Sequence, residues 1–250
     1  MFSLQNKVAL VTGCSRGIGM EMAIALAKAG ADIVGVSKSL TRENSELTSI
    51  LEQLGRKFYT YQCDFSNRED VVTFANKVST EHQIDILVNN AGTIYREPSV
   101  THNIDQWDNI LETNLSSQFI LSQAVGKQMV ERKSGKIIFT ASLLSFQGGL
   151  TVPSYAASKG AIKQLTHALA NEWAKDNVQV NAIAPGYIAT DNTSALREDQ
   201  SRNDSILARI PAGRWGTPAD IGGAVVFLAS EASNYVNGIV LPVDGGWLAR

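Results

Sequence analysis

The feature that most constrains this chain is a regular alternation of short apolar runs with longer segments of helical period. The apolar runs are typical of buried strands and span residues 8–11, 33–36, 84–88, 137–139, 178–184 and 239–243. A further strand is expected at residues 58–63, where polar and apolar residues alternate. Between the runs, apolar residues recur every three or four positions, as at Ile162, Leu165 and Leu169, which predicts crossover helices. This order predicts an α/β fold in which a parallel sheet carries helices on both faces.

Length and charge narrow the class of protein. The chain has 250 residues, enough for one sizeable core, and no shift in composition marks a linker, so we expect residues 1–250 to form a single domain. Its 22 basic and 24 acidic residues give a net charge of −2 without a dense basic stripe, which argues against nucleic acid as a partner. No apolar run reaches the roughly 18 residues that span a bilayer, and the polar start is unlike a signal peptide. The sequence therefore predicts a cytoplasmic protein without a membrane partner.

The cysteines and histidines predict neither a disulfide framework nor a metal site. Cys14 and Cys63 are too few for such a framework, and with His82, His102 and His167 they show no metal-ligand spacing. We expect free thiols and no metal.

A glycine-rich turn follows the first predicted strand and opens the first predicted helix. Residues 12–19 read Thr-Gly-Cys-Ser-Arg-Gly-Ile-Gly. Backbone N–H groups at a helix N-terminus can face a pyrophosphate, and glycine permits its close approach. The spacing differs from the commoner Gly-x-Gly-x-x-Gly, and a tight strand-to-helix link is the alternative. The residues expected at the phosphates are Gly13, Ser15, Arg16, Gly17, Ile18 and Gly19.

The choice between NAD and NADP depends on the residue about 20 positions after this turn, where an acid favours NAD and a base accommodates a 2′-phosphate. The chain has Ser37 and Lys38 there. Together with Arg16, Lys38 can pair with the phosphate of NADP; the alternative is a solvated lysine. The residues alone leave the cofactor open.

Tyr155 and Lys159 lie four residues apart in a helical segment and share one face of it. Oxidation of an alcohol needs a base for the hydroxyl proton, and reduction of a ketone needs an acid for the alkoxide. The phenol of Tyr155 fits both roles if the ammonium of Lys159 favours its ionised form. Ser142 follows a predicted strand, where it can hydrogen-bond the substrate oxygen. Taken singly, the tyrosine is typical of a packing residue and the serine of a turn.

Several motifs occur together in this chain: residues 12–19, the Asn-Asn-Ala-Gly sequence at 89–92, Asn114, Ser142, Tyr155-x-x-x-Lys159 and Pro185-Gly186. In this combination the chain resembles the short-chain dehydrogenase/reductase family along essentially its whole length. The resemblance implies a Rossmann fold with a seven-stranded parallel sheet, a nicotinamide cofactor and a catalytic tetrad. The tetrad is Asn114, Ser142, Tyr155 and Lys159, with Asn114 helping to hold a water that connects Lys159 to solvent. Outside the family, such an asparagine is usually a local hydrogen-bonding residue.

The same resemblance implies further cofactor contacts. Asp64 would meet the adenine, Asn90 would line the cofactor channel, and Ile188 and Thr190 would contact the nicotinamide carboxamide. A helix cap ahead of residues 67–81 is the alternative for Asp64. Besides the turn, the residues expected at the cofactor are Ser37, Lys38, Asp64, Asn90, Gly92, Tyr155, Lys159, Pro185, Gly186, Ile188 and Thr190.

Residues 142–149, 171–175, 210–216 and 243–248 resemble family members that act on a secondary alcohol or ketone of a sugar acid, of the 2-deoxy-D-gluconate or 2-dehydro-3-deoxy-D-gluconate type. That resemblance implies NAD as the usual cofactor, although Ser37-Lys38 departs from a simple NAD signature.

The pocket for a sugar acid needs a cation and hydrogen-bonding side chains. Arg96 is the expected carboxylate clamp because a guanidinium binds a carboxylate bidentately, and a surface loop residue is the alternative. Gln147 and Tyr187 are expected at sugar hydroxyls, with Ser142 and Tyr155 at the reacting oxygen.

Other functions stay open at this point. A 3-oxoacyl thioester reductase, a gluconate 5-dehydrogenase or another secondary-alcohol dehydrogenase fits the same scaffold, as does a regulator that binds a dinucleotide without catalysis. The polar composition of residues 190–204 argues against a long acyl channel, and the intact tetrad argues against the regulator.

Residues 186–212, called the polar segment below, have few apolar residues and no strong period. We expect them to form a mobile lid over the carboxyl ends of the strands, with Arg214 bracing the region that follows.

We also expect a homotetramer, because the helices with Asn114 and Tyr155 carry long apolar stripes, residues 247–249 form an apolar tail, and the resemblance implies symmetric tetramers.

Overall fold

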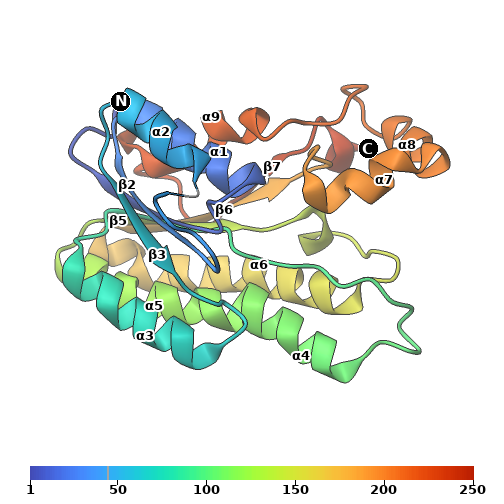
Figure 1. Cartoon of the computed structure of the whole chain (residues 1–250), viewed down its shortest axis with the longest axis horizontal. Helices are drawn as coiled ribbons and strands as arrows, with labels where there is room; N and C mark the ends of the chain where they lie inside the picture. Colours follow the sequence, from blue (N-terminus) through green and yellow to red (C-terminus); the bar gives the residue numbers. More distant parts are fainter. Residues whose placement is uncertain (44) are drawn as a thin grey trace.

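The computed structural model describes residues 1–43 and 45–250 and contains a seven-stranded, entirely parallel sheet (Figure 1). The strand order is β3-β2-β1-β4-β5-β6-β7. The strands are β1 (Val8–Thr12), β2 (Asp32–Ser37), β3 (Phe58–Gln62), β4 (Ile86–Asn89), β5 (Gly135–Thr140), β6 (Val178–Pro185) and β7 (Val240–Val243). Each predicted strand is therefore confirmed. The alternation in β3 follows from its place at the edge of the sheet, where only part of the strand is buried.

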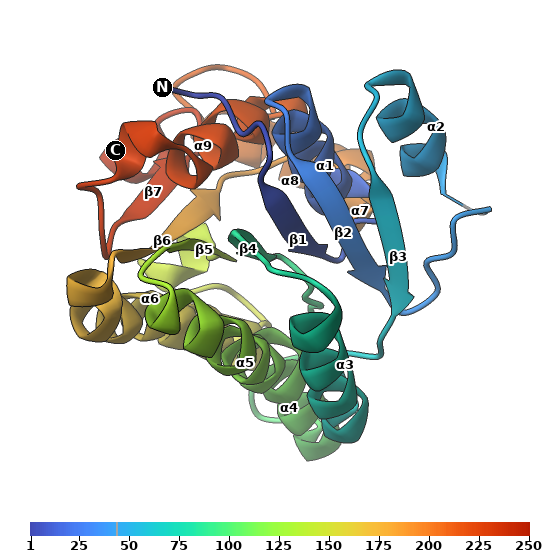
Figure 2. The ribbon, with the colours of Figure 1, turned by 90° about the vertical axis from the view of Figure 1, so that its left-hand side faces the viewer.

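Helices cover both faces of the sheet, as predicted (Figure 2). On one face lie α1 (Gly17–Lys28), α2 (Glu46–Gln53) and α9 (Ala219–Ala229), and on the other lie α3 (Arg68–Glu81), α5 (Ser117–Glu131) and α6 (Pro153–Trp173). Each face has its own apolar core, centred on Leu26 and Ile33 in the first and on Phe139 and Ile162 in the second. The apolar residues of each core are spaced three or four apart in the helices and form continuous runs in the strands. A sheet covered on both faces requires this pattern.

A π-helical turn, η1 (Glu112–Ser116), joins α4 (Ile104–Leu111) to α5. Such turns insert an extra residue into a helix and are frequent at functional sites. Asn114 lies in this turn and is completely buried. The sequence did not predict the turn, because its residues are compatible with a continuous helix.

The polar segment contains more regular structure than its sequence predicts. It forms η4 (Asp191–Thr193), α7 (Ser194–Glu198) and α8 (Gln200–Leu207), which lie beside the C-terminus (Figure 1). Ile206 is the buried residue of α8, so this helix has almost no apolar period to detect. Ile206 packs with Ile210, Leu143 and Trp247 in a small separate core.

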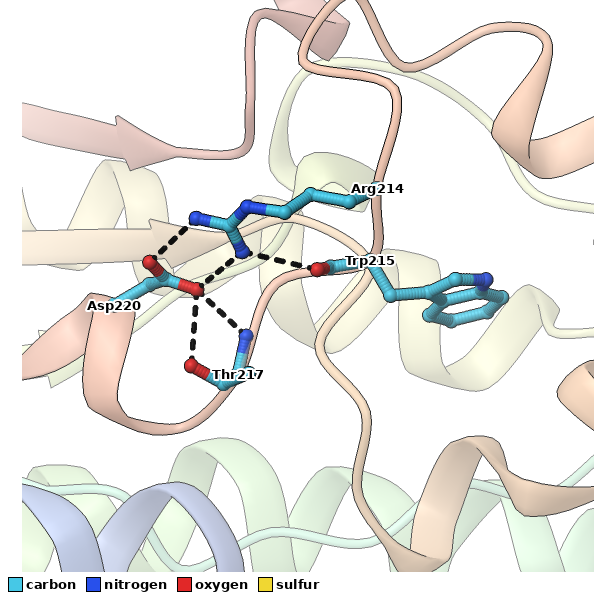
Figure 3. Close-up of polar contacts among 4 residues, drawn as sticks. All are labelled: Arg214, Trp215, Thr217 and Asp220. Atoms are coloured by element: carbon cyan, nitrogen blue, oxygen red, sulfur yellow. Dashed lines mark hydrogen bonds and ion pairs between the residues drawn. The ribbon is translucent and has the colours of Figure 1, made fainter.

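Arg214 braces the region that follows the polar segment, as predicted (Figure 3). The guanidinium donates two hydrogen bonds of 2.8 Å to the two carboxylate oxygens of Asp220 and a third to the backbone oxygen of Trp215. The same carboxylate accepts from the backbone N–H and the hydroxyl of Thr217. These contacts hold the loop before α9 in one conformation.

Three properties of the described residues bear on the earlier expectations. Cys14 and Cys63 are free and buried. Within residues 1–43 and 45–250, no cluster of three or more histidine, cysteine or acidic side chains has an arrangement suited to a metal ion. No helix in that part of the chain combines the length and the apolar character needed to cross a membrane.

Candidate functional site

A hollow of about 580 Å³ opens at the carboxyl ends of the strands, beside the point where the chain order of the sheet reverses between β1 and β4. Ligands of open α/β sheets bind at such a switch point. Most residues expected at the cofactor line this hollow, together with Arg96. They are Gly13, Ser15, Arg16, Gly17, Ile18, Gly19, Ser37, Lys38, Asp64, Asn90, Gly92, Tyr155, Lys159 and Thr190.

The glycine turn has the backbone geometry that its sequence predicts. Gly13 and Gly17 have φ of +66° and +58°, a conformation that side-chain-bearing residues rarely adopt. At Gly19, a Cβ atom would lie 2.2 Å from the backbone oxygen of Gly13. The side chain of Arg16 makes no capping hydrogen bond at the start of α1. The first N–H groups of this 12-residue helix are therefore suited to an anion.

Asn90 holds the turn from the neighbouring strand. Its side-chain nitrogen donates to the backbone oxygens of Thr12 and Gly13, at 3.1 and 3.3 Å. The hydroxyl oxygen of Thr12 accepts from the backbone N–H groups of Asn90 and Ala91. Asn90 thus lines the hollow, as expected, and also fixes the shape of the phosphate turn.

Lys38 and Asp64 both line the hollow and form an ion pair with 2.6 Å between Nζ and the nearer carboxylate oxygen. This hydrogen bond is the main reason why the pKa of Asp64 falls to about 2. The other carboxylate oxygen accepts from the backbone N–H and the hydroxyl of Ser66. The helix cap before α3 is Asn67, not Asp64. Lys38 is therefore an exposed lysine that has an ion-pair partner in the hollow.

The start of α6 places Tyr155 and Lys159 at the hollow. The ammonium of Lys159 donates to the backbone oxygen of Thr140 at 2.6 Å and lies 5.7 Å from the centre of the Tyr155 ring. Burial lowers the pKa of Lys159 to about 8. Burial also raises the pKa of Tyr155, whereas a hydrogen bond with Ser142 and the charge of Arg96 act in the opposite direction. Arg96 is thus a second cation that acts on the phenol, besides Lys159, whose ammonium donates its hydrogen bond to the end of β5.

Ser142 does not line the hollow, but its side chain is near enough to Tyr155 to lower the pKa of the phenol. Its hydroxyl also accepts from the backbone N–H of Leu144 and caps the short helix η2 (Leu143–Ser145). The hydroxyl of Ser145 in turn donates to the backbone oxygen of Lys159 at 2.6 Å. The serine is therefore a turn residue and a neighbour of Tyr155 at once.

Asn114 also lies outside the hollow and joins three segments. Its side chain accepts from the backbone N–H of Thr93 at 2.8 Å and donates to the backbone oxygen of the same residue at 2.9 Å. Its nitrogen further donates to the hydroxyl of Ser158 at 3.2 Å, and that hydroxyl donates to the backbone oxygen of Tyr155. Asn114 thus positions the loop after β4 against α6.

Arg96 comes from that loop and lines the hollow with an exposed side chain. Among the residues that the structure describes, its guanidinium has no hydrogen-bond or ion-pair partner. An unpaired guanidinium beside Tyr155 is suited to the carboxylate of a ligand.

Gln147 and Tyr187 were expected at the substrate, but neither lines the hollow. The side-chain oxygen of Gln147 accepts from the indole N–H of Trp247 and from Arg209. Tyr187 packs against Trp247 and Trp215, with ring centroids 4.7 and 5.4 Å apart. These side chains stabilise the polar segment and the C-terminal residues.

Three residues at and after the end of β6 are likewise outside the hollow: Pro185, Gly186 and Ile188. Pro185 and Ile188 are buried, and a Cβ atom on Gly186 would lie 2.5 Å from Cα of Asp244. Ile188 pairs with Gly216 in an isolated parallel bridge, which joins the start of the polar segment to the loop that follows it. Thr190, further along, reaches the hollow.

The sequence missed some residues that line the hollow. Thr113 has a buried hydroxyl without a partner among the described residues, and Thr140 supplies the oxygen that accepts from Lys159. Asp191 reaches the phosphate turn, with its carboxylate 3.6 Å from a guanidinium nitrogen of Arg16. Each of these residues is next to or close to a predicted one, which is the only sequence signal for them.

Comparisons with known proteins agree with this architecture. Residues 13–248 match a family model described as enoyl-(acyl carrier protein) reductase. The 2-dehydro-3-deoxy-D-gluconate 5-dehydrogenase of Pseudoalteromonas atlantica is 62% identical over 250 residues, which cover 100% of this chain and 98% of that protein.

Two solved structures are similar over the whole chain. One, from Beutenbergia cavernae, is provisionally named an NAD(P)-dependent gluconate 5-dehydrogenase and contains NADP at low occupancy; it has a TM-score of 0.96, is 45% identical and covers 100% of this chain and 99% of its own. The other, from Agrobacterium tumefaciens, is provisionally named a 2-deoxy-D-gluconate 3-dehydrogenase and has NADP bound; its TM-score is 0.94, with 47% identity and coverage of 100% and 99%.

The fold and these matches define an oxidoreductase that uses a nicotinamide cofactor and acts on CH–OH groups. The chain belongs to the short-chain dehydrogenase/reductase family, which confirms the resemblance seen in its motifs.

Proposed function

We propose that this enzyme interconverts a secondary alcohol and a ketone on a sugar acid of the 2-dehydro-3-deoxy-D-gluconate or 2-deoxy-D-gluconate type. The observation that carries this proposal is the unpaired guanidinium of Arg96 in the same hollow as Tyr155. A sugar acid has a carboxylate for Arg96 and a carbon bearing oxygen for Tyr155. The names of the similar proteins point to the same class of substrate.

In this proposal, Tyr155 is the general acid and base. During reduction, the phenol gives its proton to the oxygen of the substrate as the carbonyl carbon gains a hydride; during oxidation, the phenolate takes the hydroxyl proton as the hydride leaves. Ser142 donates a hydrogen bond to the same oxygen and stabilises its developing charge. The nicotinamide, when bound, supplies or accepts the hydride.

Lys159 and Asn114 have supporting roles. Lys159, whose pKa burial lowers to about 8, would relay a proton toward Tyr155. Asn114 fixes the helix turn that carries Tyr155 and the loop that carries Arg96. By its family, Asn114 also helps to hold a water between Lys159 and solvent.

The residues of the hollow fit a dinucleotide. The pyrophosphate would lie on the turn from Gly13 to Gly19 at the start of α1, where the N–H groups face it. The adenosine would lie near Lys38 and Asp64, and the nicotinamide near Tyr155 and Thr190.

We propose NADP as the preferred cofactor, although the family resemblance favoured NAD. Two cations, Arg16 and Lys38, line the hollow, and the end of β2 carries no acidic residue. The ammonium of Lys38 has three donors and gives one to Asp64, so it can also bind a 2′-phosphate. The two similar structures with bound NADP support this choice.

Replacement of Lys38 tests the cofactor proposal. Lys38→Gln should weaken NADP binding about tenfold, the size of a lost charged hydrogen bond, and leave NAD binding unchanged. Lys57→Gln is the control, because Lys57 is an exposed lysine that does not line the hollow. Equal loss of both cofactors in Lys38→Gln would contradict NADP recognition by this residue.

The substrate proposal is tested by following nicotinamide absorbance with NADPH and NADH and with three ketones: 2-dehydro-3-deoxy-D-gluconate, 5-keto-D-gluconate and a 3-oxoacyl thioester. Reduction of the first supports the proposal. Reduction of 5-keto-D-gluconate alone would indicate a gluconate 5-dehydrogenase, which the similarity to the Beutenbergia cavernae structure favours as second candidate. Activity on the thioester alone would overturn the sugar-acid assignment.

We further propose that residues 1–250 act as one catalytic domain, with the polar segment as a lid over the hollow. Thr190 and Asp191 of that segment already line the hollow. We also propose that the enzyme is cytoplasmic, and the two buried cysteines without a disulfide support a reducing compartment.

We also propose a homotetramer, measurable by sedimentation or light scattering. Phe119 on α5 is 40% exposed, which suits a subunit contact. The apolar tail at residues 247–249 was expected to contribute to the tetramer. It does not support this expectation, because Trp247 is buried against the polar segment of its own chain.

A further inference from the structure

We propose that His102 and Ser154 form a positioning pair that fixes the clamp loop (residues 93–103) against α6 and thereby sets the affinity for the carboxylate of the substrate. The proposal rests on the proposed role of Arg96 as carboxylate clamp. Neither His102 nor Ser154 lines the hollow, so both would act through Arg96 and not by touching the substrate.

Arg96 is held in place only by the loop around it. Its guanidinium has no partner within residues 1–43 and 45–250, so the backbone must direct it. Three residues before it, Thr93 forms two hydrogen bonds with the side chain of Asn114. Directly after it, the backbone N–H of Glu97 donates to the backbone oxygen of Thr151 at 2.8 Å, just before α6.

The second half of the loop is closed by side chains. The carboxylate of Glu97 accepts from the hydroxyl of Tyr95 at 2.7 Å and from the backbone N–H of Asn103 at 3.2 Å. Asn103 in turn caps the start of α4. The residues on both sides of Arg96 are thus tied to one another and to the next helix.

His102 connects this closed loop to the catalytic helix. Its Nε2 lies 3.0 Å from the hydroxyl oxygen of Ser154. Ser154 is completely buried in the first turn of α6 and directly precedes Tyr155. The imidazole also packs edge-on against the rings of Tyr95 and Trp107, with centroids 5.3 and 6.3 Å away.

The His102–Ser154 contact affects which substrates the enzyme binds. The distance between the guanidinium of Arg96 and the phenol of Tyr155 must match the distance between the carboxylate and the reacting carbon of the substrate. The His102–Ser154 contact joins the two segments that carry these groups. Loss of the contact should therefore weaken binding of an acid and leave a neutral analogue unaffected, because the latter makes no use of Arg96.

Steady-state kinetics of His102→Ala with a keto sugar acid and with its carboxamide test the proposal. We expect KM for the acid to rise about tenfold, in line with a misplaced binding group, with kcat changed less than about twofold and KM for the amide unchanged. His102→Gln should restore most of the affinity, since its amide reaches Ser154 in place of Nε2. His167→Ala, at a histidine of α6 without a partner among the described residues, is the matched control.

Ser154→Ala is an independent variant that removes the other half of the pair. It should reproduce the effect of His102→Ala, and the double variant should be no worse than either single one, because both remove the same contact. Additive effects would overturn the pair. An equal rise of KM for acid and amide in both single variants would show a general structural role and would also overturn it.

Arg96→Ala, measured in parallel, separates this inference from the proposed function. If Arg96→Ala raises KM selectively for the acid while His102→Ala and Ser154→Ala do not, the positioning pair alone is wrong. If Arg96→Ala raises KM equally for the acid and the amide, Arg96 does not bind the carboxylate. The proposal of a positioning pair is then wrong as well.

Discussion

The ammonium nitrogen of Lys159 lies 2.6 Å from the backbone oxygen of Thr140 and donates a hydrogen bond to it. This contact directs the charge to the end of β5, within the protein interior. Burial lowers the pKa of Lys159 from 10.5 to about 8. The folded protein therefore releases this proton at a lower pH than the unfolded chain does.

We expect this lysine to make stability depend on pH. Below about pH 8 it is charged in both states, and the folded state bears the full cost of the buried charge. Between about pH 8 and 10.5 the unfolded chain binds more protons, so the free energy of unfolding rises with pH. Relative to Lys159→Met, the wild type should gain about 1.4 kcal/mol per pH unit in this window. Denaturant unfolding of both proteins at several pH values measures the difference, and a constant difference would contradict the burial of charge.

Tyr155→Phe should remove the proton-transfer step and preserve the fold. The ring stays in place, so the dissociation constant of NADPH should change less than about twofold, whereas kcat should fall by about 10²- to 10⁴-fold. Tyr235→Phe is the control, since Tyr235 is fully exposed. Single-turnover absorbance and fluorescence titration give the two quantities. Turnover near the wild-type level in Tyr155→Phe would assign the acid and base role to another group.

Arg96→Gln should change the pH dependence of the reaction. The charge of Arg96 lowers the pKa of Tyr155, so its removal raises that pKa. Oxidation requires the phenolate, and the rise of kcat/KM with pH should therefore move to higher pH in the variant. The profiles should be measured with a neutral alcohol as substrate, because it has no carboxylate for Arg96 to bind. Lys163→Gln, on the same helix as Tyr155 but outside the hollow, should leave the profile unmoved. A profile of Arg96→Gln that coincides with the wild type would show that the two groups are not coupled.

The sequence predicts those parts of the site that depend on local spacing. The glycine turn needs Gly13, Gly17 and Gly19 within a few residues of one another, and one helical turn separates Tyr155 from Lys159. The apolar runs also locate every strand except the edge strand β3, because a doubly covered parallel sheet leaves few polar positions in its inner strands.

The sequence does not predict contacts between distant residues. Gln147 is 100 residues away from Trp247, whose indole it binds, so nothing near Gln147 indicates that it stabilises the polar segment. The direction of the Lys159 ammonium depends in the same way on where β5 ends. Even the helices of the polar segment lack a signal, because their packing involves single residues such as Ile206.

The contacts between Arg214 and Asp220 lead to a prediction about the polar segment. Asp220→Asn keeps one oxygen for the N–H of Thr217 but loses the charged pairing with both guanidinium nitrogens (Figure 3). The end of the segment should open more often, so trypsin should cleave at Arg197, Arg202 or Arg209 roughly fivefold faster. Asp105→Asn, in the exposed first turn of α4, is the matched control. If the two variants are cleaved at the same rate, the segment is held by its small core around Trp247 and not by the Asp220 carboxylate.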